Sequence, residues 1–255
     1  MRKSGFSLAV TAVLLTAACG SSGNGPSSLP STGSSPITSP SPTALTPNGV
    51  GKKAPKAMLA AAMKALSGSS SVRFKANVVD QKQRITMDLQ VTRTGTKGTV
   101  SMPFKGKRGT MQLIVLGKES YVQGTGQFWQ NAIGAEKGPA AGKLAGQMFG
   151  GHWVKMPTSS GMAQGMPASP ADVAKMFTST TGPLKKGKPK TVDGRPAIGL
   201  ISSDGTMYIA TTGDPVPLLV APAKAAQKQQ ATFSDYDVPV PITAPAGALD
   251  LTKLK

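Results

Sequence analysis

Cys19 is the one cysteine of this 255-residue chain, and the thiolate of a cysteine is a nucleophile that can be modified covalently. Arg2 and Lys3 stand near the start of the chain, and a short apolar run from Phe6 to Ala18 follows them. This run is too short for a permanent membrane-spanning helix, which needs about 20 apolar residues. Positive charges, a short apolar stretch and small residues before a cleavage point are typical of a secretory signal. We therefore expect an exported protein with a signal peptide over residues 1–18.

The segment Leu14-Leu15-Thr16-Ala17-Ala18-Cys19-Gly20 resembles the lipobox of bacterial lipoproteins. It departs from the usual pattern at one place, because leucine is preferred where this chain has Thr16. The resemblance implies a diacylglycerol on the Cys19 thiol, cleavage before Cys19, and an amino terminus that is often acylated as well, for example with palmitate. Each buried CH₂ group contributes about 0.8 kcal/mol, so two or three acyl chains would hold the protein firmly at a membrane. The alternative is an ordinary signal peptide in which Cys19 has no role.

The charge balance favours anionic partners. The chain has 29 basic and 11 acidic residues, and without Arg2 and Lys3 the remaining 27 basic residues leave about +16. An exported chain rarely meets nucleic acid, and seven Phe, three Tyr and two Trp offer bases little to stack on, so we expect no nucleic-acid partner. Anionic lipid headgroups and anionic wall polymers are the expected neighbours. The one dense cluster, Lys185, Lys186, Lys188 and Lys190, predicts a solvated hairpin loop rather than a binding site.

Composition divides the mature chain into three parts. Residues 19–55 are rich in Ser, Pro, Gly and Thr, cannot bury a core, and predict a disordered tether with a reach of about 30–35 Å. Residues 56–245 are long enough for one substantial folded domain. Residues 246–255 form a C-terminal tail.

Hydrophobic periodicity predicts a helix followed by many strands. Met58, Leu59, Ala62, Met63 and Leu66 follow helical spacing, with Gly68 as a C-cap. A Ser169 cap, Pro170 and Asp172 predict a second helix that reaches about Phe177, and a weaker helix is expected over 143–149. Period-two alternation and glycine turns predict strands over 72–78, 85–92, 99–102, 110–116, 120–123, 128–130, 190–192, 197–202, 207–211, 216–221, 229–236 and 238–242.

These elements indicate an α+β fold with a strongly curved antiparallel sheet, an incomplete barrel whose concave face is covered by a few helices. Such an arrangement leaves an apolar hollow, and the 12 methionines suit an adaptable lining. The alternative is that the methionines fill a loosely packed core. The residues that we expect at the hollow are Met58, Met63, Leu66, Phe74, Met87, Leu89, Val91, Leu113, Val115, Met176 and Phe177.

Residues for catalysis are sparse. The single histidine, His152, lies next to Trp153 outside any catalytic motif and predicts a structural or surface role. Paired carboxylates, a Ser-His-Asp set and the His/Cys spacing of a zinc site are absent from the sequence. The segment Asp235-Tyr236-Asp237 could bind a cation but more readily ends a strand. We therefore expect no enzyme, no catalytic residue, no cofactor and no metal.

The layout of the mature chain resembles the LppX/LprG lipoproteins of mycobacteria, whose wider fold is that of the LolA/LolB lipoprotein carriers. The resemblance rests on Cys19, the tether, Ala57 to Leu66, Ser70-Ser71-Val72-Arg73-Phe74, Glu119-Ser120-Tyr121-Val122, Phe128-Trp129, Trp153-Val154-Lys155, Val192-Asp193-Gly194 and Asp204-Gly205. It implies an actinobacterial type of lipoprotein whose cavity takes the acyl chains of lipids or glycolipids.

Two functions from different classes follow. The first is a lipid-anchored carrier of lipid or lipoglycan at the extracytoplasmic face of the cell membrane. The second is a scaffold or binding lipoprotein whose basic surface holds wall polymers or a protein partner.

Replacing Cys19 with Ala tests the anchor. Because the thioether would be lost, we expect the Cys19→Ala protein to leave the membrane fraction for the soluble exported fraction, as measured by fractionation and immunoblotting. If the variant stays in the membrane as firmly as the parent protein, the anchor is not at Cys19.

Overall fold

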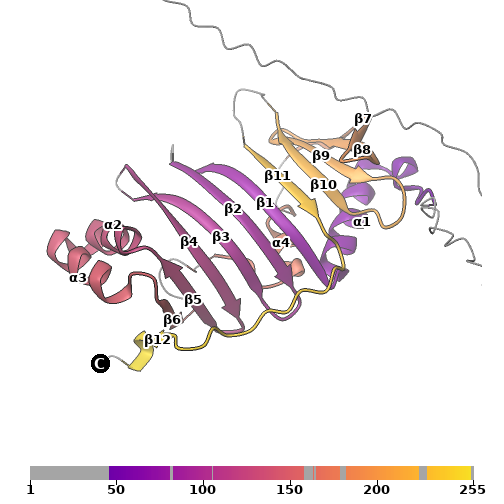
Figure 1. The fold of residues 1–255 in the computed structure, drawn as a ribbon. Coiled ribbons are helices and arrows are strands. Elements are labelled where there is room, and N and C mark those ends of the chain that lie inside the picture. The colour runs from indigo at the N-terminus through magenta and orange to yellow at the C-terminus, as the bar shows by residue number, and fades with distance from the viewer. Residues whose placement is uncertain are drawn as a thin grey trace, which may run out of the picture. The chain divides into compact units, whose positions relative to one another are not determined.

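The computed structural model describes residues 46–80, 83–104, 106–157, 163, 165–178, 182–223 and 229–253. The predicted signal peptide, Cys19 and most of the predicted tether lie outside these residues. The prediction that the tether extends to residue 55 is wrong, because Val50 is buried and Pro47 pairs with Thr212, so the folded domain begins before residue 56. Figure 1 shows the arrangement of the elements. The helices are η1 (Val50–Lys52), α1 (Pro55–Gly68), α2 (Gly126–Lys137), α3 (Pro139–Phe149), α4 (Pro170–Lys175) and η4 (Leu251–Lys253). The strands are β1 (Ser71–Asp80), β2 (Gln83–Thr92), β3 (Thr96–Phe104), β4 (Lys107–Leu116), β5 (Glu119–Gly124), β6 (Trp153–Pro157), β7 (Lys185–Val192), β8 (Arg195–Ile201), β9 (Gly205–Ala210), β10 (Pro217–Pro222), β11 (Gln230–Ser234) and β12 (Leu249–Asp250).

The strands of the described residues form one twelve-stranded sheet in the order β12-β6-β5-β4-β3-β2-β1-β11-β10-β9-β8-β7. Neighbouring strands are antiparallel, except that the short β12 runs parallel to β6. The sheet is open, with β12 and β7 as its two edges. The predicted α+β class with a curved, incompletely closed sheet is confirmed. Strand β12 lies within residues 246–255, which the sequence predicts to be a C-terminal tail. Part of this segment therefore joins the sheet by pairing with β6.

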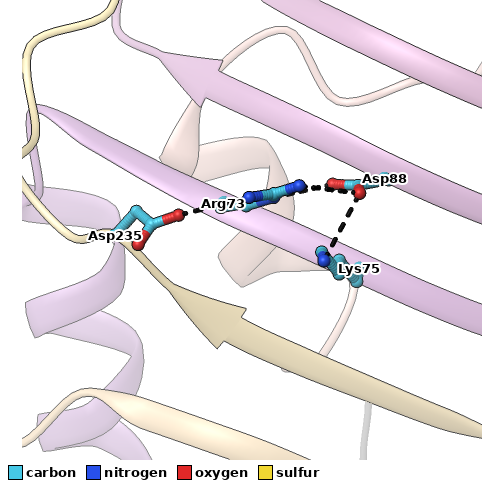
Figure 2. A network of polar contacts seen from close by, with 4 residues as sticks. All are labelled: Arg73, Lys75, Asp88 and Asp235. Atoms are coloured by element: carbon cyan, nitrogen blue, oxygen red, sulfur yellow. Dashed lines mark hydrogen bonds and ion pairs between the residues drawn. The ribbon is translucent and has the colours of Figure 1, made fainter.

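Alternation along the strands gives the sheet an apolar inner face. In the β1–β2 register, Val72 pairs with Val91 and Phe74 with Leu89, and all four side chains are buried. Arg73, between them in β1, points to the opposite, outer face (Figure 2). This two-residue period buries one side of each strand and leaves the other in water, as the sequence predicts.

The helices pack on the inner face in two groups. Helix α1 begins with Pro55, a residue suited to the first helical turn, and buries Met58, Ala62, Met63 and Leu66. It contacts α4, β8 and β10. Helix α4 is capped as predicted, because the Ser169 hydroxyl accepts a hydrogen bond from the Asp172 backbone N–H at 3.2 Å. Helix α2 contacts β3, β4 and β5, and α3 packs against α2.

Glycines allow α2 and α3 to approach each other closely. A Cβ added at Gly142 would lie 2.5 Å from the Gln130 carbonyl oxygen and 2.8 Å from the Gly134 Cα. A Cβ at Gly146 would lie 2.7 Å from the Gly126 carbonyl oxygen. The two helices therefore form a rigid pair, which we call the α2–α3 hairpin.

The prediction of a strand over 128–130 is wrong, since these residues belong to α2. The Thr125 hydroxyl accepts a hydrogen bond from the Phe128 backbone N–H at 3.1 Å and so caps the helix. The Phe128 ring lies against the backbone of Gly109 and Gly124, where side chains would leave no room for it. Phe128 thus packs α2 against the face of the sheet formed by β4 and β5, and residues 128–130 do not add a strand.

The prediction of a strand over 238–242 is also wrong. Pro239 and Pro241 have no backbone N–H to donate to a sheet, and this segment instead runs along the strand ends between β11 and β12 (Figure 1). Side chains hold it there: the Ser71 hydroxyl donates to the Val238 carbonyl at 2.6 Å, and the Lys97 ammonium to the Pro241 carbonyl at 3.1 Å.

The lysine cluster at 185–190 does not form the predicted hairpin loop, because it lies within β7, at the edge of the sheet. Its four lysines are exposed. Charged side chains on an edge strand discourage pairing with a strand of another molecule. This role explains the four lysines, and a ligand is not needed to explain them. The turn after β7 is as predicted, with positive φ at both Asp193 and Gly194, as in a two-residue hairpin.

An ionic network on the outer face links the centre of the sheet (Figure 2). The Arg73 guanidinium donates two hydrogen bonds to the Asp88 carboxylate, both at 2.9 Å, and lies 3.8 Å from Asp235. The Lys75 ammonium lies 3.5 Å from the same Asp88 carboxylate. Because β1 carries both cations, the network joins β2 to the end of β11. The hydrogen bond from Arg73 lowers the pKa of Asp88 below its ordinary value.

Replacing Gly142 with Ala should destabilise the domain by about 1–3 kcal/mol, because the added methyl group meets backbone atoms that cannot move aside cheaply. Gly68 is the matched control, since a Cβ there meets no atom within 4 Å and Gly68→Ala should change stability by less than about 1 kcal/mol. Urea unfolding of both variants measures the difference. Equal effects would show that α2 and α3 tolerate a wider separation.

Asp88→Asn should weaken the domain at neutral pH by about 0.2–1 kcal/mol, the usual range for an exposed pair. The pKa of Asp88 is depressed in the folded protein, so its stabilising contribution is complete above the unfolded-state pKa and is lost as the pH falls through the folded pKa. The free energies of unfolding of parent and variant should therefore converge in acid, once the pH is below the depressed pKa of folded Asp88. A gap that persists unchanged in acid would mean that Asp88 acts through something other than its charge.

Candidate functional site

An apolar pocket lies on the inner face, between α1, the end of α4 and the strands β8 to β10. It encloses about 230 Å³. Its lining residues are Leu59, Met176, Phe177, Leu184, Leu200, Ser202, Asp204, Gly205, Met207 and Val220. Most of these side chains are aliphatic or aromatic, and the polar ones come from the single turn between β8 and β9.

The floor of the pocket comes from three strands in register. Leu200 of β8 lies opposite Met207 of β9, and Met207 lies opposite Val220 of β10. All three therefore project from the same face of the sheet, and Leu200 and Met207 are buried. Leu59 of α1 contributes from the helix that covers this face.

The rim of the pocket has an apolar and a polar side. Met176 directly follows α4 and is 49% exposed, although its side chain is apolar. On the polar side, the Ser202 hydroxyl donates to the Gly205 carbonyl and accepts from the Asp204 N–H, both at 3.3 Å. A flexible thioether at the mouth of an apolar pocket can move to admit a ligand.

Phe177 forms the wall between the pocket and the aromatic core. Its ring centroid lies 6.1 Å from that of Phe74 and 5.4 Å from that of Phe233. The Phe74 and Phe233 rings are in turn 5.4 Å apart, across the β1–β11 pair. The position of Phe177 thus limits how far the pocket extends toward the centre of the sheet.

The predicted cavity residues fall into two groups. Met176 and Phe177 line the pocket. Eight others are buried in the main core, and Met87 is packed against it in a partly buried position. The buried eight are Met58, Met63, Leu66, Phe74, Leu89, Val91, Leu113 and Val115.

Sequence reasoning did not select the other apolar lining residues: Leu59, Leu184, Leu200, Met207 and Val220. A usable signal was present for two of them, because Leu200 and Met207 flank the Asp204-Gly205 turn at positions that a hairpin places face to face. The approach of α1 and of Leu184 depends on tertiary packing and has no local signal.

The methionines serve both of the roles considered from the sequence. Met58, Met63, Met111 and Met156 are buried in the main core, where they fill space. Met176 and Met207 line the pocket.

Two clusters of opposite charge elsewhere in the described residues are paired within themselves. A groove of about 370 Å³ on the outer face is lined by Arg73 and Asp88 of the ionic network, together with polar side chains such as Gln90, Lys97 and Gln112. Near β12, the Lys155 ammonium lies 2.6 Å from Glu119, and the Tyr121 hydroxyl donates to Glu119 at 2.8 Å. Hydrogen bonding to Lys155 lowers the pKa of Glu119. These groups stabilise the sheet through each other.

The residues weighed for chemistry occupy structural positions. His152 is exposed in the turn before β6. Asp237 follows β11 and accepts hydrogen bonds from the Ser70 N–H at 2.6 Å and from the Ser70 hydroxyl at 2.9 Å. Burial raises the pKa of Tyr236, whose hydroxyl donates to the Pro217 carbonyl at 2.7 Å. Across the described ranges, His, Cys, Asp and Glu side chains do not gather into a group of three that could hold a metal.

Within the part of the chain that the structure describes, each helix is too short or too polar to cross a membrane.

Comparison with known proteins gives a structural answer only. No family model matches the sequence, and no curated protein matches it either. Among solved structures, the chain is similar to LprF from Mycobacterium bovis, with a TM-score of 0.51 and 13% identity over 79% of this chain and 100% of that one. It also matches the Mycobacterium tuberculosis lipoprotein LppX, with a TM-score of 0.41 and 15% identity over 74% of this chain and 99% of that one. The expected resemblance to the LppX/LprG lipoproteins is therefore confirmed at the level of the fold, and the domain has the fold of LprF.

Proposed function

We propose that this protein binds a lipid or lipoglycan by taking part of an acyl chain into the pocket between α1, α4 and β8 to β10. The observation that carries the proposal is an apolar hollow on the inner face of an LprF-like sheet, with the exposed Met176 at its mouth. An exposed methionine beside an apolar hollow is a surface that a hydrocarbon chain can cover, and covering it removes apolar area from water.

The volume of the pocket limits what it holds. About 230 Å³ is below the range of roughly 300–1,000 Å³ that is usual for small-molecule sites. The pocket as it stands therefore accepts one end of an acyl chain. Met176 is half exposed, so its flexible side chain can move outward and lengthen the pocket. Movement of the Phe177 ring away from the pocket would lengthen it toward the centre of the sheet.

The headgroup stays at the rim. Ser202 and Asp204 place hydroxyl and carboxylate groups on one side of the mouth, while Lys185 follows the lining residue Leu184 and is exposed. Polar atoms of a headgroup keep their contact with water there, so that only the hydrocarbon is desolvated. Burying the headgroup itself would cost several kcal/mol without matching partners.

Attachment through Cys19 fits this function. A lipidated Cys19 and a tether that ends before Pro47, which pairs with Thr212, would hold the domain near the extracytoplasmic surface of the cell membrane, where its ligand is found. The domain would then act as a binding or carrier lipoprotein rather than as an enzyme. The excess of basic residues supports a position near anionic headgroups.

Filling the pocket tests the proposal. Val220 projects from β10 into the pocket and is partly exposed, so Val220→Trp should occupy the hollow. Ile201 is the matched control, because it follows the pocket residue Leu200, lies outside the lining and is 40% exposed. Both variants are made in the Cys19→Ala protein, purified from the soluble exported fraction of the native host and examined by native mass spectrometry. We expect co-purifying lipid with the Ile201→Trp protein and little or none with the Val220→Trp protein.

Thermal unfolding first establishes that both variants are folded. If the Cys19→Ala protein carries no lipid before any pocket change, the domain is not a lipid carrier. If Val220→Trp retains as much lipid as Ile201→Trp, lipid binds elsewhere on the protein.

A further inference from the structure

Helix α3 carries an exposed apolar stripe, formed by Ala140, Leu144 and Met148. These residues recur at intervals of four, so their side chains lie on one face of the helix. Leu144 is 57% exposed and Met148 is 48% exposed, and Ala140 is exposed as well. Leu144 and Met148 are large apolar side chains one helical turn apart, so they form one continuous exposed apolar patch and not two isolated exposed residues.

The stripe is held in a fixed orientation. Gly142 and Ala145, on the opposite face of α3, are buried against α2. The Trp129 ring of α2 packs edge-on against Phe149 at the end of α3, with centroids 5.4 Å apart. Since α2 is in turn fixed to the sheet through Phe128, the hairpin presents the stripe on a rigid support at one end of the domain (Figure 1).

Three exposed lysines lie on or next to the hairpin, near the start of α3. Lys137 and Lys143 lie on the hairpin and are exposed, and Glu136 is the one acidic residue of its two helices. Lys107, at the start of β4, is exposed and borders the hairpin beside Asn131 and Pro139. A helix with apolar residues on one face and lysines beside it is the pattern of a helix that lies in the interface of an anionic bilayer.

We propose that the α2–α3 hairpin is a docking site for an anionic lipid bilayer, with Leu144 and Met148 inserted among the headgroups and Lys137, Lys143 and Lys107 near the phosphates. Helix α3 has 11 residues, about 16 Å in length, and therefore lies along the surface rather than crossing it. A bilayer fits this site better than a protein partner, because a stable protein interface needs about 20–30 residues on each side.

The docking site is separate from the lipid pocket. The hairpin rests on β3 to β5, and the pocket lies on β8 to β10, at the other side of the central strands β2, β1 and β11. Adjacent strands are about 4.8 Å apart, so the β4 and β9 positions are separated by roughly 30 Å along the sheet. Docking through α3 therefore leaves the pocket mouth uncovered.

A fluorescent label at the stripe tests the proposal independently of lipidation. Cys19 is the one cysteine of the chain, so the full chain with Cys19→Ser and Met148→Cys takes a single environment-sensitive NBD label. Val238 is the matched control: it is 47% exposed, lies after β11 and receives the same label as Val238→Cys in the Cys19→Ser background. Each protein is mixed with vesicles of equal parts phosphatidylglycerol and phosphatidylcholine, with and without brominated acyl chains.

We expect a blue shift and bromine quenching of the label at position 148 and neither at position 238. Adding Leu144→Ser to the Met148→Cys protein should weaken the response about tenfold in lipid concentration, because one apolar side chain no longer inserts. Pure phosphatidylcholine vesicles should give a weaker response, since the lysines lose their partners.

Three results would overturn the proposal. The first is a label at position 148 that responds to neither kind of vesicle. The second is equal quenching at positions 148 and 238, which would assign membrane contact to the rest of the chain. The third is a blue shift that depends on protein concentration without vesicles, which would mean that a second copy of this chain covers the stripe.

Discussion

The pairing of β1 with both β2 and β11 holds this domain together. Arg73 pairs with Ser234, so residues from the two ends of the domain sequence meet at the centre of the sheet. Phe74 and Phe233 seal the pair on the inner face, and Arg73 reaches Asp88 and Asp235 on the outer face. Joining segments this far apart in the sequence costs chain entropy, because a long loop must close. The contacts on both faces of the β1–β11 pair offset that cost.

This central pairing divides the sheet into two halves with different coverings. In the half from β2 to β12, strands β2 to β6 follow the chain in order, and β12 joins the edge from the C-terminal end. This half carries the α2–α3 hairpin. The half from β11 to β7 runs back through the C-terminal strands and is covered by α1 and α4. A pocket in one half and an exposed stripe over the other can therefore act on different molecules, while β1 fixes their separation.

The sequence predicts most of this fold, because half-buried strands carry a strict two-residue period. The alternation in 72–78 and 85–92 locates β1 and β2, and the Asp193-Gly194 pair locates the β7–β8 turn. The run over 128–130 was misassigned because a short apolar segment fits a strand or a buried helix equally well, although Thr125 was available as a cap. Among the pocket residues, Met176 and Phe177 could be predicted from the sequence, because the Ser169 cap and Pro170 locate the helix that precedes them. Leu59 and Leu184 come near the strands only through tertiary packing, which has no local sequence signal.

The distribution of aromatic side chains explains why the pocket lies where it does. Phe104, Phe128, Trp129 and Phe149 pack in sequence under and within the hairpin, and Phe74, Phe177 and Phe233 fill the centre of the inner face. Beyond β11 the inward residues become aliphatic, and Leu200, Met207 and Val220 leave space that the larger rings occupy elsewhere. The boundary of that space is Phe177, two residues past the end of α4. The strand residues Leu200, Met207 and Val220 thus fix the floor of the pocket, since the register of the sheet cannot shift without turning its apolar face to water. A change in the capacity of the pocket must therefore come from the segment that follows this short helix.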